Sequence, residues 1–328
     1  MRIRRISNHQ TIVSPSTLSP FRYPGGKSWL RSRVIKWLKE LGTPLDYFIE
    51  PFAGGGSVSL AVAELNLADQ IVMIELDPEV AALWRVILGG QAAELVARIR
   101  SFRLRRNAVI QTLADDNKEE VVTAFRCLLK NRVHRGGILA PGAGLLKNGE
   151  NGKGLSSRWY PETIAARIEK IQLFRSRISF SEGNGLNTIA AFAAEERAAF
   201  FVDPPYFTNG RGPGQRLYRH NEVDHSNLFS ALAKSCGPCL ITYHNSRPIR
   251  VLAESHGFSC RNVRMKTTHH RIRNELLIFK PSMLKRTRVR SDLSPVNYGS
   301  ESGYSTHTRP LLHVDSILSG AFHPVLEK

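Results

Sequence analysis

Four consecutive residues, Asp203-Pro204-Pro205-Tyr206, combine the groups needed to activate a poorly nucleophilic amine. The exocyclic amine of adenine is such a group because its lone pair is delocalised into the ring. The Asp203 carboxylate and the Pro204 carbonyl could accept the amino hydrogens, and the double proline removes two competing backbone donors. Tyr206 offers a flat face for a base flipped out of a duplex. The alternative interpretation is a proline-rich turn at a strand end.

A glycine-rich segment could hold a nucleotide-like ligand. Residues 47–49 predict a short buried strand that runs into Pro51-Phe52-Ala53-Gly54-Gly55-Gly56, and a helix is expected from Ser57. Glycines let the backbone pass close beneath a ligand without a Cβ clash. An acidic residue at the end of the following strand, where Glu75 and Asp77 stand, would hold a ribose hydroxyl pair. A tight turn without a ligand is the alternative.

The hydrophobic pattern predicts an α/β fold that positions both segments. Further strands are expected at 70–76, 177–180, 199–202, 239–243, 260–265 and 276–279, and helices at about 29–38, 78–88, 187–195, 228–234 and 249–255. The uninterrupted apolar run at 199–202 is typical of a buried parallel strand. Asp203 would therefore follow its carboxyl end, where open α/β sheets bind ligands.

The α/β pattern is interrupted once. Residues 92–130 predict helices rich in arginine, and residues 131–160 are glycine-rich and basic, which indicates loops or hairpins. We therefore expect a basic arm at 1–18, a catalytic domain formed by 19–88 and 177–280, an inserted domain at 89–176, and a disordered tail at 281–328.

The charge balance favours a nucleic-acid partner. Lys and Arg number 46 against 28 Asp and Glu, which gives a net charge of +18. A basic surface kept for solubility is the alternative. Within the insertion, side chains that could contact phosphates or base edges are interleaved with glycines, namely Lys130, Asn131, Arg132, Arg135 and Arg158. Residues 211–219 could form a lid over a flipped base or a mobile loop without specific contacts.

Four cysteines are too few for a disulfide framework. The Cys236-Gly-Pro-Cys239 sequence is open to three interpretations: a redox pair, part of a zinc site with His256 and Cys260, or buried thiols without a metal, which we favour because the pair precedes a strand. No apolar run is long enough for a membrane span, and no secretory signal is evident, so a cytoplasmic protein without a membrane partner is expected.

The chain resembles the Dam-like family of DNA adenine N6-methyltransferases. The resemblance rests on Phe21-Arg22-Tyr23-Pro24-Gly25-Gly26-Lys27, Glu50-Pro51-Phe52-Ala53-Gly54-Gly55-Gly56-Ser57 and Asp203-Pro204-Pro205-Tyr206, which occur in the family's order and span about residues 19–280. It implies a Rossmann-like class I methyltransferase sheet with an inserted target-recognition domain, S-adenosyl-L-methionine as cofactor and double-stranded DNA as substrate. The cofactor residues that it implies are Tyr23, Lys27, Glu50, Phe52, Gly54, Gly56, Ser57, Glu75, Asn184 and Asp203.

Two departures bear on the specificity. The family usually has Asp near the end of its third strand, where this chain has Asn184. The insertion carries Asn131-Arg132 and Arg158-Trp159-Tyr160-Pro161, as in a prophage-type branch, so a GATC target does not follow; a cognate restriction endonuclease is a conceivable partner. The alternatives are the same reaction on cytosine N4 or RNA adenine, and a non-catalytic DNA-binding relative.

Overall fold

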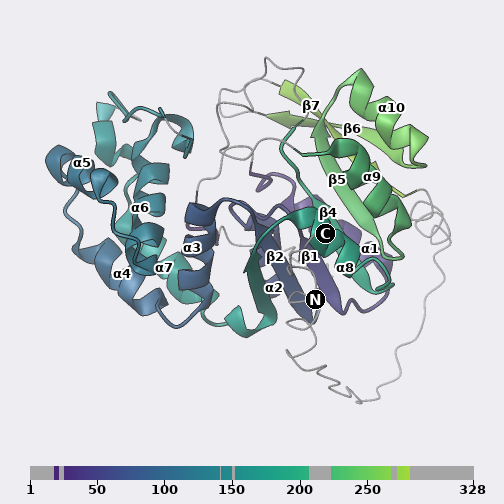
Figure 1. Cartoon of the computed structure of the whole chain (residues 1–328), viewed down its shortest axis with the longest axis horizontal. Helices are drawn as coiled ribbons and strands as arrows, with labels where there is room; N and C mark the ends of the chain where they lie inside the picture. The colour runs from purple at the N-terminus through teal and green to yellow at the C-terminus, as the bar shows by residue number, and fades with distance from the viewer. Residues whose placement is uncertain are drawn as a thin grey trace, which may run out of the picture.

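The computed structural model describes residues 18–21, 26–140, 142–149, 152–206, 223–266 and 272–280. The expected arm up to residue 17, Tyr23, the expected lid at 211–219 and the expected tail at 281–328 lie outside the described residues. The described chain forms the expected α/β fold around a seven-stranded sheet (Figure 1).

The strand order is β3-β2-β1-β4-β5-β7-β6. The strands are β1 (Tyr47–Glu50), β2 (Gln70–Glu75), β3 (Ile178–Glu182), β4 (Ala198–Val202), β5 (Cys239–His244), β6 (Ser259–Lys266) and β7 (Ile272–Phe279). The first five run parallel, and β7 lies antiparallel between β5 and β6. The order reverses between β1 and β4, as in a Rossmann-like sheet, where ligands bind outside the carboxyl ends of the strands.

Apolar residues of each central strand point alternately to two buried faces. In β1, Phe48 joins one hydrophobic cluster, and Tyr47 and Ile49 join the other. The first face is covered by α1 (Arg31–Leu41), α2 (Ser57–Glu64) and α3 (Pro78–Leu88), and the second by α8 (Gly185–Ala191), α9 (His225–Lys234) and α10 (Arg247–Ser255). Strands buried on both faces explain the continuous apolar runs in the sequence.

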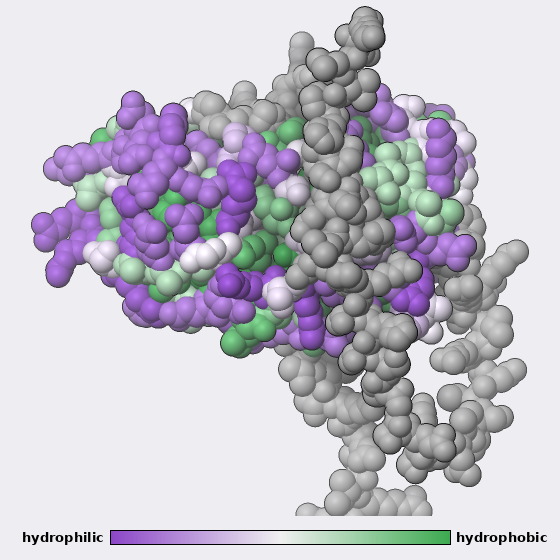
Figure 2. Space-filling view, turned by 60° about the horizontal axis from the view of Figure 1, so that its bottom comes forward, coloured by the Kyte–Doolittle hydropathy of each residue, from purple (hydrophilic) through white to green (hydrophobic). Residues whose placement is uncertain are grey.

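The region between α3 and β3 is mostly helical and lies to one side of the sheet (Figure 1). It contains α4 (Ala92–Ser101), α5 (Arg106–Ala114), α6 (Glu120–Val133) and α7 (Pro161–Ile171). Phe102, Phe125 and Trp159 pack edge to face at its centre, with ring centroids 5.1–6.2 Å apart. Their cluster continues into the core beside the sheet, while hydrophilic side chains cover much of the outer surface (Figure 2).

Several predicted boundaries shift for local reasons. The helix expected at 187–195 begins at Gly185, because the side chain of Asn184 caps it by accepting from the Leu186 N–H. β7 begins at Ile272 rather than at 276, because its polar first half pairs with β6. The stretch at 131–160 contains short 3-10 helices, η1 (Arg135–Gly137) and η3 (Gly154–Arg158), and an isolated bridge between His134 and Leu145.

No single helix among the described residues is long and apolar enough to cross a membrane. The consecutive helices α3 and α4 reach that length and composition together, but the chain bends by 107° between them.

Candidate active site

The predicted functional residues meet at the carboxyl edge of the sheet. Of the predicted residues, Glu50 ends β1, Glu75 ends β2 and Asp203 follows β4; His244, which was not predicted for the site, ends β5. These strands are parallel neighbours in the order β2-β1-β4-β5, so their ends lie side by side. Residues almost two hundred positions apart in the sequence are thereby brought to one edge. The sequence pattern predicts the motif residues at the carboxyl ends of strands.

Asp203 is held from two sides. The Lys27 ammonium lies 2.9 Å from Oδ2 and 2.7 Å from Oδ1 of Asp203. The hydroxyl of Thr242, in the neighbouring strand β5, donates to Oδ1 at 2.6 Å. Lys27 is only 5% exposed and Asp203 19%, so the pair is largely removed from water. Loss of one partner from such a pair leaves an uncompensated charge, which is strongly destabilising.

The Tyr206 ring is fixed at both its face and its hydroxyl. The Lys27 ammonium lies 4.9 Å from the ring centroid, a distance suited to a cation–π contact. The ring also packs in tilted geometry on Tyr243 and His244, at centroid distances of 5.8 and 5.4 Å. The Tyr206 hydroxyl donates to Glu275 of β7 at 2.6 Å. The tetrapeptide that follows β4 is thus tied to β5 and β7 through its first and last residues.

The glycine-rich turn between β1 and α2 is locked onto neighbouring elements. The Gly54 N–H donates to Oε2 of Glu75 at 2.8 Å, and the Gly54 carbonyl accepts from the Trp84 indole N–H at 2.8 Å. Gly56 has φ +58°, and a Cβ there would lie 2.7 Å from the Met73 methyl and 2.8 Å from the Trp84 ring. Any other residue at 56 would be strained by the positive φ, and its Cβ would also clash with Met73 and Trp84. The turn therefore requires glycine.

Both buried carboxyls beside this turn are stabilised by local donors. Glu75 accepts from the N–H groups of Gly54, Leu76 and Asp77 at 2.8–2.9 Å, and burial raises its pKa to about 7. Glu50 accepts from the Ser59 N–H at 3.0 Å and hydroxyl at 2.5 Å, and burial raises its pKa to about 8. In each case desolvation disfavours the charged form more strongly than the hydrogen bonds favour it.

The β3–α8 turn packs directly against the glycine-rich loop. A Cβ on Gly185 would lie 2.3 Å from the Pro51 carbonyl, so the two backbones are in close contact there. Asn184 is exposed at this turn, with its carbonyl oxygen already engaged by the Leu186 N–H at 3.0 Å. Phe52 and Ser57 are half-buried in the loop itself. All the predicted cofactor residues that the structure describes therefore lie on the strand-end loops or their immediate neighbours.

The segment before α1 connects this loop with the helical region. The Ser19 hydroxyl donates to the Gly55 carbonyl at 2.6 Å. Arg132 of α6 donates to the Pro20 carbonyl, and Arg167 of α7 donates to the Ser19 carbonyl at 3.0 Å. Two arginines of the helical region thus hold the backbone that precedes Lys27.

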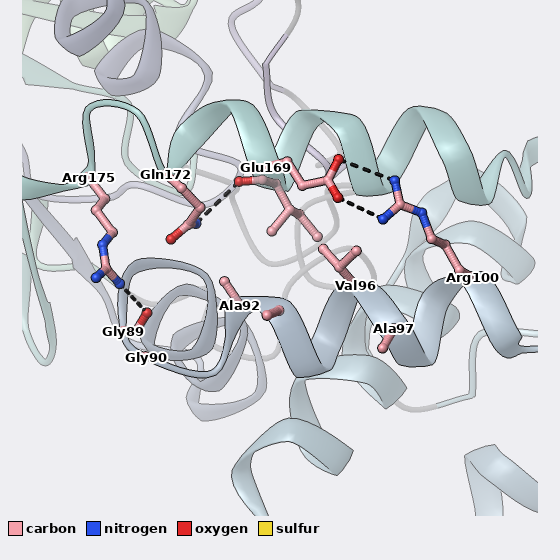
Figure 3. Close-up of a pocket in the computed structure, with 11 residues that line it drawn as sticks. Gly89, Gly90, Ala92, Val96, Ala97, Arg100, Glu169, Gln172 and Arg175 are labelled. Carbon is pink, nitrogen blue, oxygen red and sulfur yellow. Dashed lines mark hydrogen bonds and ion pairs between the residues drawn. The ribbon is translucent and has the colours of Figure 1, made fainter.

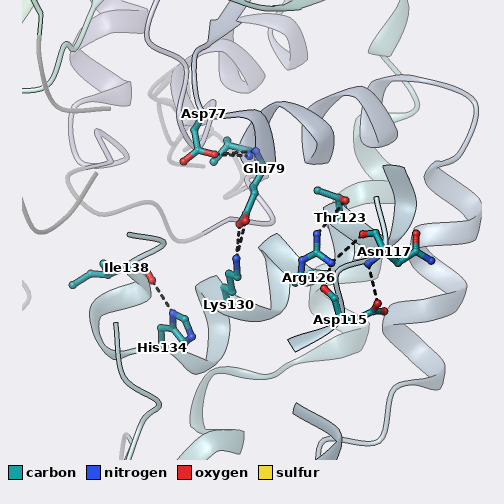
Figure 4. Close-up of polar contacts among 10 residues, drawn as sticks. Asp77, Glu79, Asp115, Asn117, Thr123, Arg126, Lys130, His134 and Ile138 are labelled. Carbon is teal, nitrogen blue, oxygen red and sulfur yellow. Dashed lines mark hydrogen bonds and ion pairs between the residues drawn. The ribbon is translucent and has the colours of Figure 1, made fainter. Parts of the chain in front are cut away.

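This placement corrects the role expected of Asn131 and Arg132. Both are buried, at 0% and 4% exposure, and Asn131 donates to the Gly137 carbonyl at 3.0 Å. In this structure both side chains donate to backbone carbonyls inside the protein, so neither is exposed for contact with DNA. Lys130 donates to both carboxylate oxygens of Glu79, at 2.8 and 2.7 Å (Figure 4). Of the expected DNA contacts, Arg135 is exposed and Arg158 half-buried.

The cysteines differ from the expected buried thiols in one respect: Cys239 is buried, but Cys236 is exposed and Cys260 half-buried. Within the described ranges, no three His, Cys, Asp or Glu side chains group in a way that could hold a metal ion.

A separate groove of about 710 Å³ lies between α4 and α7 (Figure 3). Arg100 pairs with Glu169 at one end, with an N–O distance of 2.7 Å, and Arg175 donates to the Gly89 carbonyl at the other at 2.6 Å. The groove is lined by none of the residues predicted for the site, which lie at the strand ends.

Sequence reasoning missed Thr242 and Glu275, which position Asp203 and Tyr206. Thr242 has 0% exposure and sits in a predicted strand, but only the pairing of β4 with β5 brings it beside Asp203. Glu275 had a usable signal, since it is a lone acidic residue at the start of an apolar run.

No family model matches the chain, and no curated protein matches it. Solved structures similar to it include the rRNA methyltransferase aviRa from Streptomyces viridochromogenes, at 13% identity over 82% of this chain and 92% of that one, with a TM-score of 0.37. The precorrin-6y C5,15-methyltransferase from Geobacter metallireducens has 11% identity over 75% and 84%, with a TM-score of 0.32. The magnesium protoporphyrin IX methyltransferase from Synechocystis, solved with bound SAM, has 11% identity over 77% and 78%, with a TM-score of 0.32. At these values, none of the similarities assigns a substrate or a reaction to this chain.

The raised pKa of Glu50 predicts a pH-dependent stability. A carboxyl whose pKa is higher in the folded than in the unfolded state stabilises the fold while protonated, so this contribution is lost as pH rises from about 4.5 to about 8. We expect Glu50→Gln to flatten the fall in unfolding free energy across this window, by at most about 1.4 kcal/mol per pH unit. Urea unfolding at several pH values measures it. Glu94→Gln, at an exposed position, is the control, and an equal change in both variants would contradict the assignment.

The burial of Arg132 predicts a structural role. We expect Arg132→Met to lower the unfolding free energy by about 1.5–3 kcal/mol, because the Pro20 carbonyl loses a charged donor. The salt dependence of duplex DNA binding should stay unchanged. Arg135→Gln, at the exposed neighbouring site, should leave the stability within about 0.5 kcal/mol. A flattened salt dependence with unchanged stability in Arg132→Met would place this side chain on DNA after all.

Proposed function

We propose that the chain is an S-adenosyl-L-methionine-dependent methyltransferase that modifies N6 of adenine in DNA, as members of the Dam-like family do. The observation that carries the proposal is the placement of Asp203. Its carboxylate is oriented by Lys27 and Thr242 at the carboxyl end of β4, on the same edge as the glycine-rich loop and Glu75. The three motifs that carry the family resemblance therefore contribute to one edge of one sheet.

The residues at this edge fit the cofactor. A carboxylate offers about four lone-pair sites, and Glu75 uses three of them on backbone N–H groups, which leaves capacity on Oε2 for a ribose hydroxyl. The tight turn at Gly54 and Gly56 lets the backbone approach the methionine part of the cofactor without a Cβ between them. Phe52, in the same turn, would also underlie the methionine part, and Asn184, in the turn after β3, would contact the adenine amine of the cofactor. When bound, S-adenosyl-L-methionine supplies an electrophilic methyl group on a sulfonium.

Asp203 and its neighbours supply the acceptor side of the reaction. The Asp203 carboxylate accepts a hydrogen of the target amine, the Pro204 carbonyl accepts the other, and the amine is thereby aligned for attack. Lys27 and Thr242 hold the carboxylate in one orientation, which is the kind of preorganisation that lowers a barrier without reorganisation during the reaction. Tyr206 presents its ring to the flipped base, and its own position is fixed by Glu275.

The helical region at 89–176 would recognise the DNA around the target. Lys130, near the end of α6, pairs with Glu79 in the first turn of α3, directly after β2, so the chain following α6 starts beside the strand ends. Exposed Arg135 and half-buried Arg158 follow in that chain. Their charges are suited to phosphate contacts.

Substitution of Asp203 tests the assignment. Asp203→Asn keeps an acceptor for Thr242 but loses the charge, so we expect methyl transfer to fall by at least about 10²-fold while DNA binding is retained. Transfer of tritiated methyl groups to duplex DNA measures the rate, and mass analysis of the digested nucleosides identifies the modified base. Thermal unfolding of both proteins checks that the buried Lys27 is tolerated.

Asp69→Asn, at an exposed loop position just before β2 and away from the carboxyl edge, is the matched control and should keep full activity. Undiminished transfer in Asp203→Asn would refute the role of Asp203. N4-methylcytosine as the product would replace the adenine assignment, and DNA binding by the wild type without any transfer would identify a non-catalytic relative.

A further inference from the structure

A group of arginines lies on the β5–α10 side of the strand ends. Arg247 and Arg250 stand in the first turn of α10, which begins three residues after His244, the last residue of β5. Arg264 lies on the neighbouring edge strand β6. Arg247 and Arg264 are exposed and Arg250 is half-buried. Figure 1 shows α10, β6 and β7 together at one end of the sheet.

The strand register places Arg264 beyond the end of β5. The last pair between β5 and β7 joins His244 to Glu275. The pairing of β6 with β7 continues through Arg264↔Asn274 and Met265↔Arg273 to Lys266↔Ile272. At about 3.3 Å per residue, these pairs extend roughly 10 Å past the carboxyl edge. The part of the β6–β7 pair beyond His244 therefore extends past the carboxyl ends of the other strands, on the side where the candidate site lies.

Neutral partners hold the central arginine of the group. Arg250 donates from Nε to Asn245 at 2.9 Å and from Nη2 to Asn262 at 2.5 Å, which ties α10 to the loop after β5 and to β6. Carboxamide oxygens fix a guanidinium without cancelling its charge. The acidic residue of α10, Glu254, lies one turn further from the strand ends.

Helix stability does not account for these charges. The first turn of a helix favours acidic side chains and disfavours arginine, because the helix dipole is positive there. The first turn of α10 contains no acidic residue and carries Arg247 and Arg250 instead. Asn245 and Asn262 hold Arg250 in place but leave its charge uncancelled, and positions where a sequence breaks a local rule are often functional.

The group begins next to the tetrapeptide. His244 packs on Tyr206 at a centroid distance of 5.4 Å, and Glu275, its partner in β7, accepts from the Tyr206 hydroxyl. A nucleotide whose base lies at Tyr206 must keep its flanking phosphates close to the same edge, since they recur about every 3.4 Å along each strand.

We propose that Arg247, Arg250 and Arg264 form a phosphate-contact surface that holds the DNA backbone beside the target base. This surface is separate from the helical region at 89–176, and it lies across the sheet from that region. The inference rests on the proposed function, because it takes duplex DNA as the substrate of the site. The DNA would then be held from both sides of the strand ends.

The test is the salt dependence of binding to a fluorescent DNA duplex. The double variant Arg247→Gln/Arg264→Gln changes exposed side chains and keeps Arg250 as a structural link. Each lost phosphate contact reduces the slope of log K against log salt by about 0.9, so we expect a reduction of about 1.8 and at least tenfold weaker binding at low salt. Lys39→Gln/Lys234→Gln removes the same charge from exposed positions in the last turns of α1 and α9, which precede β1 and β5 at the opposite edge, and should leave the slope unchanged.

An unchanged slope in the first variant, equal reductions in both variants, or no duplex binding by the wild type would each overturn the proposal. A second measurement, methyl transfer by the wild type to the same duplex, distinguishes failure of the phosphate-contact surface from failure of the proposed function. A specific loss of slope without any transfer would keep the surface and remove the reaction. Transfer with an unchanged slope in the first variant would keep the reaction and remove the surface.

Discussion

The ion pair between Lys27 and Asp203 is the interaction on which the site depends. Both groups are largely removed from water, so each needs the other to offset the cost of desolvation. The pair joins the segment before α1 to the end of β4, and Thr242 adds a bond from β5. The same ammonium lies over the Tyr206 ring, so one cation fixes the first and last residues of the tetrapeptide.

The parallel sheet supplies the second constraint, because it collects the strand ends at one edge. Glu50 is repelled there by Asp203, and Glu75 by Asp77, when these carboxyls are ionised. Burial instead raises the pKa values of Glu50 and Glu75 to about 8 and about 7, while backbone and hydroxyl donors hold their oxygens. The charge on these two carboxyls is thereby reduced, while the Asp203 carboxylate is paired with the Lys27 ammonium.

Much of this could be predicted from the sequence. Apolar runs gave the parallel strands, and the motifs placed Asp203, Glu75 and the glycine-rich turn at their ends. The burial of Asn131 and Arg132 could not be foreseen, because a basic, glycine-rich surrounding usually indicates a surface, and their partners are backbone carbonyls. Thr242 was recognised only through strand pairing, which no local pattern specifies. Glu275 stands out in the sequence as an acidic residue before an apolar run, but its contact with Tyr206 depends on the pairing of β5 with β7.

A crystal structure with a non-reactive S-adenosyl-L-methionine analogue, which carries an amine in place of the transferable methyl, tests the central claim most directly. The account predicts that the analogue lies over the glycine-rich turn, with its ribose hydroxyls bound to Glu75. Its amine should point toward the place beside the Asp203 carboxylate where the target amine would bind. The Lys27–Asp203 pair should remain intact. An analogue bound in the groove between α4 and α7, or one whose amine points away from Asp203, would contradict it.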